Sequence, residues 1–274
     1  MIPKVSIIIL DYLKSRRVEK NVESIYAQKT EVPFEVIIVD NSCDPRNAQK
    51  LESIRQKYPD TKIIINEKNE GYVQGNNKGV AASAGEYLFI VNPDIVWRDP
   101  NTLQKLVDYM ETHPSVGVLG PKQFNEGDGR VAMTVRAFPS LFLQVARRTD
   151  LRRLPYIRDR VAYDEMRHLD YTKTQPVDWL QSSFWVTRRS LWEKVGGLDT
   201  RYRIFMSDPD YCWKCWQAGL QVVFFPEVTL GADGVRCSEG GIQVFFKSWI
   251  LRQHVKDAVK YQMKYFLKGD PRKK

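Results

Sequence analysis

Four short apolar runs, separated by segments with helical spacing, occupy the first third of this 274-residue chain. They read KVSIIIL (4–10), FEVIIVD (34–40), TKIIIN (61–66) and EYLFIVN (86–92). Short runs that are apolar on both faces predict strands at the centre of a sheet, because helices must then cover both of its sides. The alternation of strands and helices therefore predicts an α/β fold with parallel strands.

Helices are predicted between these strands and after them. The segments with helical spacing or start signals are 15–28, 44–58, 76–85, 101–114 and 207–219, and two further strands are predicted over 116–124 and 220–226. Ser15 and Asp44 are expected to cap the first two helices, and Gly85 is expected to close the third. Residues 139–176 have no clear period, so a functional flap or a disordered loop is expected there.

Hydropathy and cysteine usage indicate an intracellular protein. No apolar run approaches the ~20 residues that a membrane helix requires, and the N-terminus lacks the pattern of a signal peptide, so a cytoplasmic location is expected. The four cysteines include a CWKC pair at 212–215, inside a predicted helix. Because no second C-x-x-C completes a four-thiolate zinc site, all four are expected to be free thiols.

The C-terminal segment combines a basic ridge with an apolar one. The net charge is +9, and residues 247–274 hold nine lysines and arginines against two aspartates. Lysines recur every fourth residue over 256–268, beside apolar residues that recur over 255–267. We expect a main domain over 1–240 and a basic helical extension over 241–274, which would lie on the inner face of an anionic membrane or pack with a solvated basic face. No nucleic-acid recognition motif accompanies this charge, so no nucleic-acid partner is expected.

Polar residues stand where the predicted strands end. Asp11, Asp40 and Asp94 each follow a strand closely, and NEG at 69–71 follows another. Ligands of open α/β sheets bind beyond the carboxyl ends of the strands, so these residues are expected to surround a ligand site. NPD at 92–94 is also a good turn sequence, and Asp40 is equally suited to a turn or a cap.

Six motifs in this order resemble those of the family 2 nucleotide-sugar glycosyltransferases, most closely the rhamnosyltransferase-like branch. They are VSIIILDY, VIIVDNS, NEGYVQGNNKG, YLFIVNPDIV, VGGLDTRY and SDPDYCWKCWQAG, and the resemblance covers roughly residues 4–240. It implies a GT-A fold, which is Rossmann-like in its nucleotide-binding part and has a mixed central sheet. It also implies inverting transfer of a sugar from a nucleotide-diphosphate donor to a hydroxyl of a glycan or lipid-linked acceptor, in cell-surface polysaccharide synthesis. The donor expected first is dTDP-rhamnose, and a UDP-sugar is second.

The family's metal-binding Asp-x-Asp motif corresponds to Asn92-Pro93-Asp94 in this chain. The resemblance therefore makes Asp94 the expected ligand of Mg²⁺ or Mn²⁺, which would neutralise the departing diphosphate. Asn92 is expected to contact ribose or a coordinated water. The family usually has a histidine near the position of Gly231, and none stands there. Either Asp233 replaces it, or the cation has fewer protein ligands, or the cation is dispensable.

By the same resemblance, Asp40 would accept a hydrogen bond from the N–H of a uracil or thymine ring. The other residues expected to contact the nucleotide sugar are Asp11, Tyr12, Gly71, Gly75, Asn77, Asn92 and Asp94. The two glycines of NEGYVQG would let the backbone approach the ligand closely.

The family's Glu-Asp-x-Asp motif corresponds to SDPD at 207–210, which places the catalytic base at Asp208. An acceptor hydroxyl must lose its proton as it attacks the anomeric carbon, and a carboxylate is suited to accept it. The alternative is a helix cap, because aspartate followed by proline is a typical helix start. Trp179, Gln181 and Asp210 are expected to bind the acceptor beside this base.

Two other classes of protein stay open at this point, and so does the oligomeric state. A sugar-nucleotide pyrophosphorylase has a related sheet, but a glycine- and arginine-rich loop follows its first strand, whereas LDYLKSRRVEK has no glycine. A catalytically silent sugar-binding module is compatible with the missing histidine and with Ser207 in place of glutamate.

Overall fold

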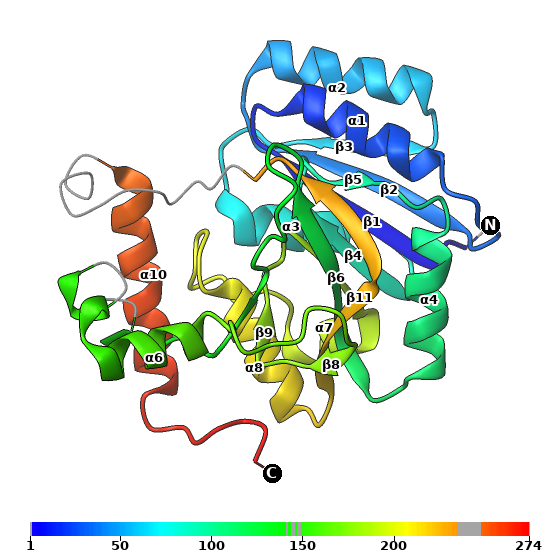
Figure 1. The fold of residues 1–274 in the computed structure, drawn as a ribbon. Coiled ribbons are helices and arrows are strands. Elements are labelled where there is room, and N and C mark those ends of the chain that lie inside the picture. The colour runs from blue at the N-terminus through cyan, green and yellow to red at the C-terminus, as the bar shows by residue number, and fades with distance from the viewer. Residues whose placement is uncertain (1, 141, 144–145, 147–148, 235–247, 274) are drawn as a thin grey trace.

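The computed structural model describes residues 2–140, 142–143, 146, 149–234 and 248–273, and within them a nine-stranded mixed sheet forms the centre of the fold (Figure 1). Its strands are β1 (Val5–Asp11), β2 (Phe34–Asp40), β3 (Thr61–Ile65), β4 (Tyr87–Val91), β5 (Val96–Trp97), β6 (Val116–Asn125), β8 (Gln175–Pro176), β10 (Phe184–Arg188) and β11 (Gln221–Ala232). They lie in the order β3-β2-β1-β4-β10-β6-β11-β5, and β8 pairs with β11. A small second sheet joins β7 (Val135–Arg136) to β9 (Trp179–Leu180).

The strands of the N-terminal half are parallel, as predicted. β1 pairs with β2 and β4, and β2 pairs with β3. β10 then runs antiparallel to β4 and β6, and β11 runs parallel to β6, so the sheet is mixed, as expected. The register places Asp11 opposite Asp40 and Ile9 opposite Val91. The residues that follow these strands therefore meet at one edge of the sheet.

Helices cover both faces of the sheet (Figure 1). They are α1 (Ser15–Tyr26), α2 (Pro45–Lys57), α3 (Gly71–Ala81), α4 (Thr102–Thr112), α6 (Pro155–Asp164), α7 (Arg189–Val195), α8 (Ser207–Gln217) and α10 (Trp249–Tyr265), with a 3₁₀ turn over Asp150–Arg153. One core joins α1, α2 and α4 to Ile7 and Ile9 of β1. The other joins α3, α7, α8 and α10 to Ile8. Alternate residues of one strand thus enter different cores, which explains why its sequence is apolar throughout.

Of the two helix caps predicted from the sequence, one is confirmed and the other is wrong. Asp44 caps α2 as predicted, and its carboxylate accepts the N–H of Arg46 at 2.8 Å. The cap predicted for α1 is wrong, because Ser15 is the first helical residue and α1 has no side-chain cap. The carboxylate of Asp11 instead accepts the N–H of Lys14, immediately before the helix.

The third predicted helix also begins and ends elsewhere. α3 starts at Gly71 rather than at residue 76, and it ends at Ala81, before Gly85. The N–H of Tyr72, in its first turn, donates to the carbonyl of Arg203 at 2.9 Å. The N–H of Gly71 also donates to the side chain of Asn69 at 2.9 Å, so a local bond and this tertiary contact together satisfy N–H groups at the helix start.

The lysine ridge of the C-terminal helix does not face outward along its whole length. Lys264 Nζ lies 2.7 Å from a carboxylate oxygen of Asp199 and 2.5 Å from one of Asp210, so it forms part of a largely buried ion-pair cluster. The apolar ridge beside it is exposed, with Met263 78% and Leu267 91% accessible. The helix therefore packs on the domain through this polar cluster and through Tyr261 and Tyr265 of the second core, and it presents other apolar residues to solvent.

Other expectations concern membrane spans and thiols. Among the described residues, no helix is both long and apolar enough to cross a membrane.

Cys43, Cys212 and Cys215 are free thiols, and burial in α8 raises the pKa of the latter two, which makes them poor nucleophiles. Cys237 and the expected domain boundary between 240 and 241 lie outside the described residues.

Replacement of Gly85 by alanine is expected to lower the free energy of unfolding by about 1–3 kcal/mol. A Cβ atom there would lie 2.6 Å from the backbone nitrogen of Ser6, in β1, which cannot move without disturbing the sheet. Gly127→Ala is the matched control, because a Cβ at that position meets nothing within 4 Å. Chemical denaturation measures both variants, and equal stability of the two would contradict the packing described here.

Candidate active site

The turn after β4 is fixed from two sides. The N–H of Asn92 donates to the carbonyl of Ser183 at 2.8 Å, and the carbonyl of Asn92 accepts from the buried side chain of Asn21 at 2.9 Å. The N–H of Ile95 also donates to this carbonyl, which closes a turn that holds Asp94 at the edge of the sheet. NPD is therefore a turn that also presents a carboxylate, so the two interpretations of this motif coexist.

The carboxylate of Asp94 contacts that of Asp233, the residue that follows β11. Burial and the hydrogen bond with Asp233 raise the pKa of Asp94 to about 6, and the nearby charge of Lys14 opposes this rise. Arg17 Nε and Lys14 Nζ lie 3.2 and 3.7 Å from Oδ2 of Asp233. Two adjacent carboxylates share a proton at low pH, because both cannot carry a negative charge at low cost.

This carboxylate pair fits a hard divalent cation, whose preferred ligands are carboxylate oxygens. Asp233 stands close in the chain to the position where the sequence lacks the expected histidine, near Gly231. The part of the chain that the structure describes contains no group of three or more His, Cys, Asp or Glu side chains able to hold a metal. A bound Mg²⁺ or Mn²⁺ would therefore take its remaining ligands from water and from a substrate.

Asp40 and Asp11 lie side by side, but only Asp40 has an oxygen to offer. Oδ1 of Asp40 accepts from the N–H of Ser42 at 2.9 Å and from Asn47 at 3.1 Å, while its buried Oδ2 has no partner among the described residues. Both oxygens of Asp11 are used, by Lys14 N and Asn47 Nδ2. An unpartnered buried oxygen is costly, so Asp40 is suited to accept from a ligand N–H. Asp11 is as buried as Asp40, but both of its oxygens are bonded within the protein, so its contact with a nucleotide stays a prediction.

The two glycines expected to approach the nucleotide approach protein atoms instead. Gly71 has φ +84°, and a Cβ there would lie 2.7 Å from the carbonyl oxygen of Arg203. A Cβ at Gly75 would lie 2.4 Å from Leu10 Cδ1. Both glycines therefore serve the start of α3 and its packing on β1, because side chains at these positions would collide with the loop and the strand.

Asn77 is bonded to another segment of the protein, whereas Tyr12 is exposed to solvent. The side chain of Asn77 donates to the carbonyl of Leu198 at 2.8 Å and accepts its N–H at 3.1 Å. Asn77 therefore fixes the VGGLD segment, and its amide is not open to a nucleotide. Tyr12, which directly follows β1, is 53% exposed and can still contact a ligand at this edge.

Asp208 is the second residue of α8, but its carboxylate does not cap that helix. It accepts from Ser182 Oγ at 2.7 Å, from Ser182 N–H at 3.2 Å and from Ser207 Oγ at 3.2 Å. α8 starts after Met206 without a side-chain cap, so the helix-cap interpretation of Asp208 is wrong. Burial raises the pKa of Asp208, against the effect of the bonds from Ser182. A carboxylate with a raised pKa is suited to accept a proton near neutral pH.

Ser182 joins Asp208 to the rest of this edge. Tyr72 Oη lies 2.6 Å from Ser182 Oγ and donates to its carbonyl at 3.0 Å. The next residue, Ser183, accepts from the turn that carries Asp94. These hydrogen bonds form one frame, which joins the segment that carries Asp94 to the segment that carries Asp208. Sequence reasoning missed Tyr72 and Ser182 because 110 residues separate them, although Tyr72 is part of the motif NEGYVQGNNKG and Ser182 directly follows Gln181.

The structure corrects the role of Asp210. Its carboxylate is fully buried and contacts Lys264 Nζ at 2.5 Å, Tyr265 Oη at 2.8 Å and Lys214 Nζ at 3.2 Å. Asp210 therefore anchors α10 to α8 and has no surface for an acceptor.

Trp179 and Gln181 directly precede Ser182 in the chain. Trp179 is half-buried and donates from Nε1 to the carbonyl of Ala137 at 2.7 Å. The N–H of Gln181 donates to the carbonyl of Thr134 at 2.8 Å. Both residues thus belong to the segment that leads to Ser182, the residue bonded to Asp208, and their contact with an acceptor stays a prediction.

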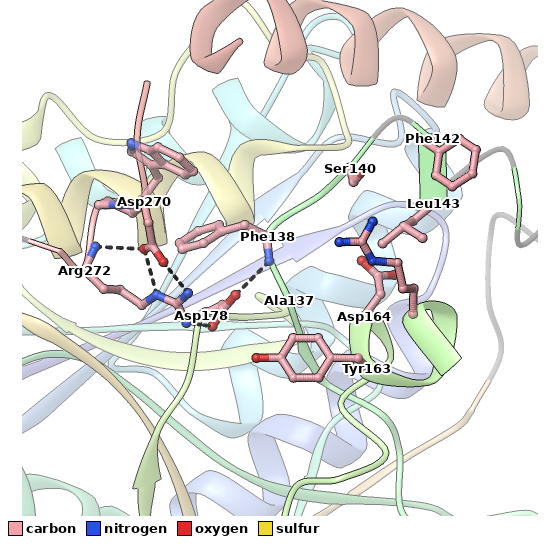
Figure 2. Close-up of a pocket in the computed structure, with 13 residues that line it drawn as sticks. Ala137, Phe138, Ser140, Phe142, Leu143, Tyr163, Asp164, Asp178, Asp270 and Arg272 are labelled. Carbon is pink, nitrogen blue, oxygen red and sulfur yellow. Dashed lines mark hydrogen bonds and ion pairs between the residues drawn. The ribbon is translucent and has the colours of Figure 1, made fainter. Parts of the chain in front are cut away.

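A cavity of about 440 Å³ lies beside the segment that carries Trp179, because Ala137 and Asp178 line it. Figure 2 shows Asp178 in this cavity, where its carboxylate accepts the N–H of Phe138 at 3.0 Å and is paired with Arg272. None of the four acidic side chains of the candidate site, Asp40, Asp94, Asp208 and Asp233, lines it. A second cavity, of about 510 Å³, is lined by Asn47, the residue that bonds to Asp40, and so adjoins the site.

Comparison with known proteins supports the motif-based interpretation. The model of the family "Glycosyl transferase family 2" matches residues 6–196. N-acetylglucosaminyl-diphospho-decaprenol L-rhamnosyltransferase of Mycobacterium tuberculosis (strain ATCC 25618 / H37Rv) is 30% identical over 211 residues. The match covers 72% of this chain and 66% of the relative, so this chain spans just under two thirds of the relative's length.

Solved structures show the same fold. The mannosyltransferase PcManGT from Pyrobaculum calidifontis, in complex with GDP-Man and Mn²⁺, has a TM-score of 0.61 and 18% identity, covering 98% of this chain and 66% of that one. GalNAc-T7 with UDP, GalNAc and Mn²⁺ has a TM-score of 0.67 and 16% identity, covering 97% of this chain and 49% of that one. The protein has the GT-A fold that the sequence predicts.

Binding of Mn²⁺ is expected to be about tenfold weaker near pH 5 than near pH 7.5, because Asp94 has a pKa of about 6 and must lose its proton to bind a cation. As the pH rises through this value, the carboxylate pair becomes anionic and affinity increases. Mn²⁺ titration followed by electron paramagnetic resonance measures this dependence without a substrate.

Asp233→Asn is expected to weaken Mn²⁺ binding and to flatten its pH dependence, since it removes the like charge beside Asp94. Glu19→Gln is the control, because Glu19 is an exposed acidic residue of α1. Equal Mn²⁺ affinity of the parent protein at both pH values would contradict the assignment of this pair.

Proposed function

Because this chain belongs to glycosyltransferase family 2, we propose that it transfers a sugar from a nucleotide-diphosphate donor to a hydroxyl group by a single, inverting displacement. Membership of this family makes it a glycosyltransferase, whereas a pyrophosphorylase transfers a nucleotidyl group, so that alternative is set aside. The observation that carries the mechanism is the carboxylate of Asp208, which is turned away from its own helix toward Ser182 and shares a frame with Asp94.

At the donor end, Oδ2 of Asp40 accepts the ring N–H of a pyrimidine base. Thymine and uracil both carry this N–H, so the residue does not distinguish dTDP-sugars from UDP-sugars. dTDP-rhamnose is the first candidate, because the relative from M. tuberculosis is named as an L-rhamnosyltransferase. A UDP-sugar is the second, and the structural neighbour GalNAc-T7 was solved with UDP.

At the diphosphate, Asp94 and Asp233 would hold Mg²⁺ or Mn²⁺, which supplies neutralisation of the negative charge that develops on the leaving group. Lys14 and Arg17, at the start of α1, add fixed positive charge in the same place. Two structural neighbours solved with Mn²⁺ support this assignment.

At the acceptor end, Asp208 takes the proton. The hydroxyl oxygen attacks the anomeric carbon, its proton passes to a carboxylate oxygen of Asp208, and the bond from that carbon to the diphosphate oxygen breaks. The diphosphate leaves with the electron pair, and the configuration at the carbon inverts because only one displacement occurs. Trp179 and Gln181 contact the acceptor sugar.

The acceptor is a glycan or a lipid-linked oligosaccharide, and α10 brings the enzyme to the membrane that contains it. The exposed apolar residues of α10 and of the turn after it are Trp249, Val255, Val259, Met263, Phe266 and Leu267. Exposed basic residues flank them, namely Arg252, Lys256 and Lys268. Apolar and basic residues exposed together are typical of a helix that lies in the interface of an anionic membrane. The proposed location is therefore the cytoplasmic face of a membrane, as a peripheral protein.

Asp208→Asn is expected to lower kcat for sugar transfer about 10²- to 10⁴-fold, because the amide cannot accept the proton. The dissociation constant of the nucleotide should change less than about twofold, since no nucleotide contact is lost. Screening dTDP- and UDP-sugars with the parent protein identifies the donor first, and Asp60→Asn, an exposed carboxylate, is the control. Undiminished turnover by Asp208→Asn would refute the assignment, and a parent protein without turnover would favour a silent sugar-binding module.

The double variant Met263→Gln, Leu267→Gln is expected to weaken binding to anionic phospholipid vesicles by about tenfold or more, because two apolar side chains no longer enter the interface. Co-sedimentation measures this binding. Ile2→Gln changes an equally exposed apolar residue at the N-terminus and should have no effect. Unchanged co-sedimentation of the double variant would rule out α10 as the membrane contact.

A further inference from the structure

One face of α10 holds residues 203–206, the loop that leads into α8. Asp257 is fully buried in this face, and its carboxylate accepts the N–H groups of Arg203, Ile204 and Phe205 at distances of 3.1 to 3.4 Å. Three consecutive N–H groups of a loop have no partners in a helix or a sheet. An ionised carboxylate is a strong acceptor for such a group of donors, and it fixes the conformation of the backbone that presents them.

The same loop is also tied to the donor side of the site. The carbonyl of Arg203 accepts the N–H of Tyr72 at 2.9 Å, and its guanidinium donates to the carbonyl of Asn69 at 2.9 Å. The side chain of Asn69 in turn accepts from Asn41, which directly follows Asp40. Through this loop, the C-terminal helix is connected to the segments on which the nucleotide and the acceptor would bind.

The conformation of the loop decides where α8 starts. Met206, its last residue, is in the left-handed conformation with φ 65°, which a residue with a side chain adopts only where its surroundings impose it. Asp208 follows two residues later. α10 also holds the first turn of α8 through the contact of Lys264 with Asp210. The position of the Asp208 carboxylate therefore depends on contacts made by the C-terminal helix.

We propose that Asp257 is a positioning residue for sugar transfer: by holding residues 203–206 from α10, it places the carboxylate of Asp208 for proton transfer. This inference rests on the proposed function, in which Asp208 is the base. Asp257 touches no substrate and acts only through the loop. α10 is accordingly part of the catalytic unit as well as the proposed membrane contact.

Asp257→Asn tests this role. The amide has nearly the same size, but it lacks the charge and directs N–H groups toward other N–H groups. We expect kcat to fall about 10- to 100-fold, because a small displacement of the base is enough for such a loss. The KM of the donor and the dissociation constant of its nucleotide should stay within about twofold. Asp257→Glu keeps the charge and should recover part of kcat.

Asp270→Asn is the matched control. Asp270 is another aspartate of the C-terminal region, paired with Arg272 and remote in contacts from the loop, so kcat should not change. If Asp257→Asn fails to fold, Gln253→Ala is measured instead. The side chain of Gln253 donates to Asp257 at 2.9 Å, so its removal weakens the hold of Asp257 on the loop without removing the charge. The expected result is again a lower kcat with an unchanged KM.

The outcomes separate this inference from the function on which it rests. A folded Asp257→Asn with the kcat of the parent overturns the inference, as does a Gln253→Ala variant with unchanged kcat where Asp257→Asn does not fold. A loss of nucleotide affinity equal to the loss of kcat also overturns the inference, because the bonds from Asp257 to the loop would then have a merely structural role. If Asp208→Asn itself retains turnover, the proposed base is wrong, whatever the result at Asp257.

Discussion

The hydrogen bonds from Ser182 to the carboxylate of Asp208 are the interaction on which the candidate site depends. An aspartate at a helix start ordinarily accepts N–H groups of its own first turn, and here it accepts from a distant segment instead. Ser182 also contacts Tyr72 of α3, and the neighbouring Ser183 holds the turn of Asp94. The sheet edge, α3 and α8 therefore form one frame, which fixes the position of the Asp208 carboxylate.

The acidic side chains of the site lie in environments that suit different tasks. Asp94 and Asp233 share a hydrogen bond, and Lys14 and Arg17 lie beside them, so this end of the site combines an acidic pair with positive charge. The carboxylate of Asp208 is held by hydroxyl and N–H donors, and its burial raises its pKa. Asp94 thus lies beside another carboxylate and Asp208 among hydrogen-bond donors, while burial raises the pKa of both.

The sequence predicts those parts of the fold that depend on local patterns. The strands β1 to β4 follow from continuous apolar runs, and the capping of α2 follows from Asp44 before a proline, because both signals lie within a few residues. The start of α3 could not be predicted, since its first turn is capped by the carbonyl of Arg203 from far along the chain. Motifs likewise identify Asp208, but only the contact with Ser182 distinguishes it from a helix cap.

Contacts between segments far apart in the chain also explain why several predicted site residues have other partners in the structure. Gly75 and Asn77 are in the motif shared with the family, yet their neighbours are Leu10 and Leu198, which no spacing rule associates with them. Asp210 is two residues from Asp208 and faces the C-terminal helix, because successive positions on a helix point in different directions. A motif thus indicates which segments form a site, whereas the tertiary partners decide which of its residues face the ligand.

One measurement tests the central claim most directly: a crystal structure of the full chain with Mn²⁺ and dTDP or UDP. The account predicts the pyrimidine ring at Asp40, the diphosphate and Mn²⁺ at Asp94 and Asp233, and the carboxylate of Asp208 facing the space beyond the terminal phosphate. A nucleotide bound at any other surface, or Mn²⁺ remote from Asp94, would contradict it.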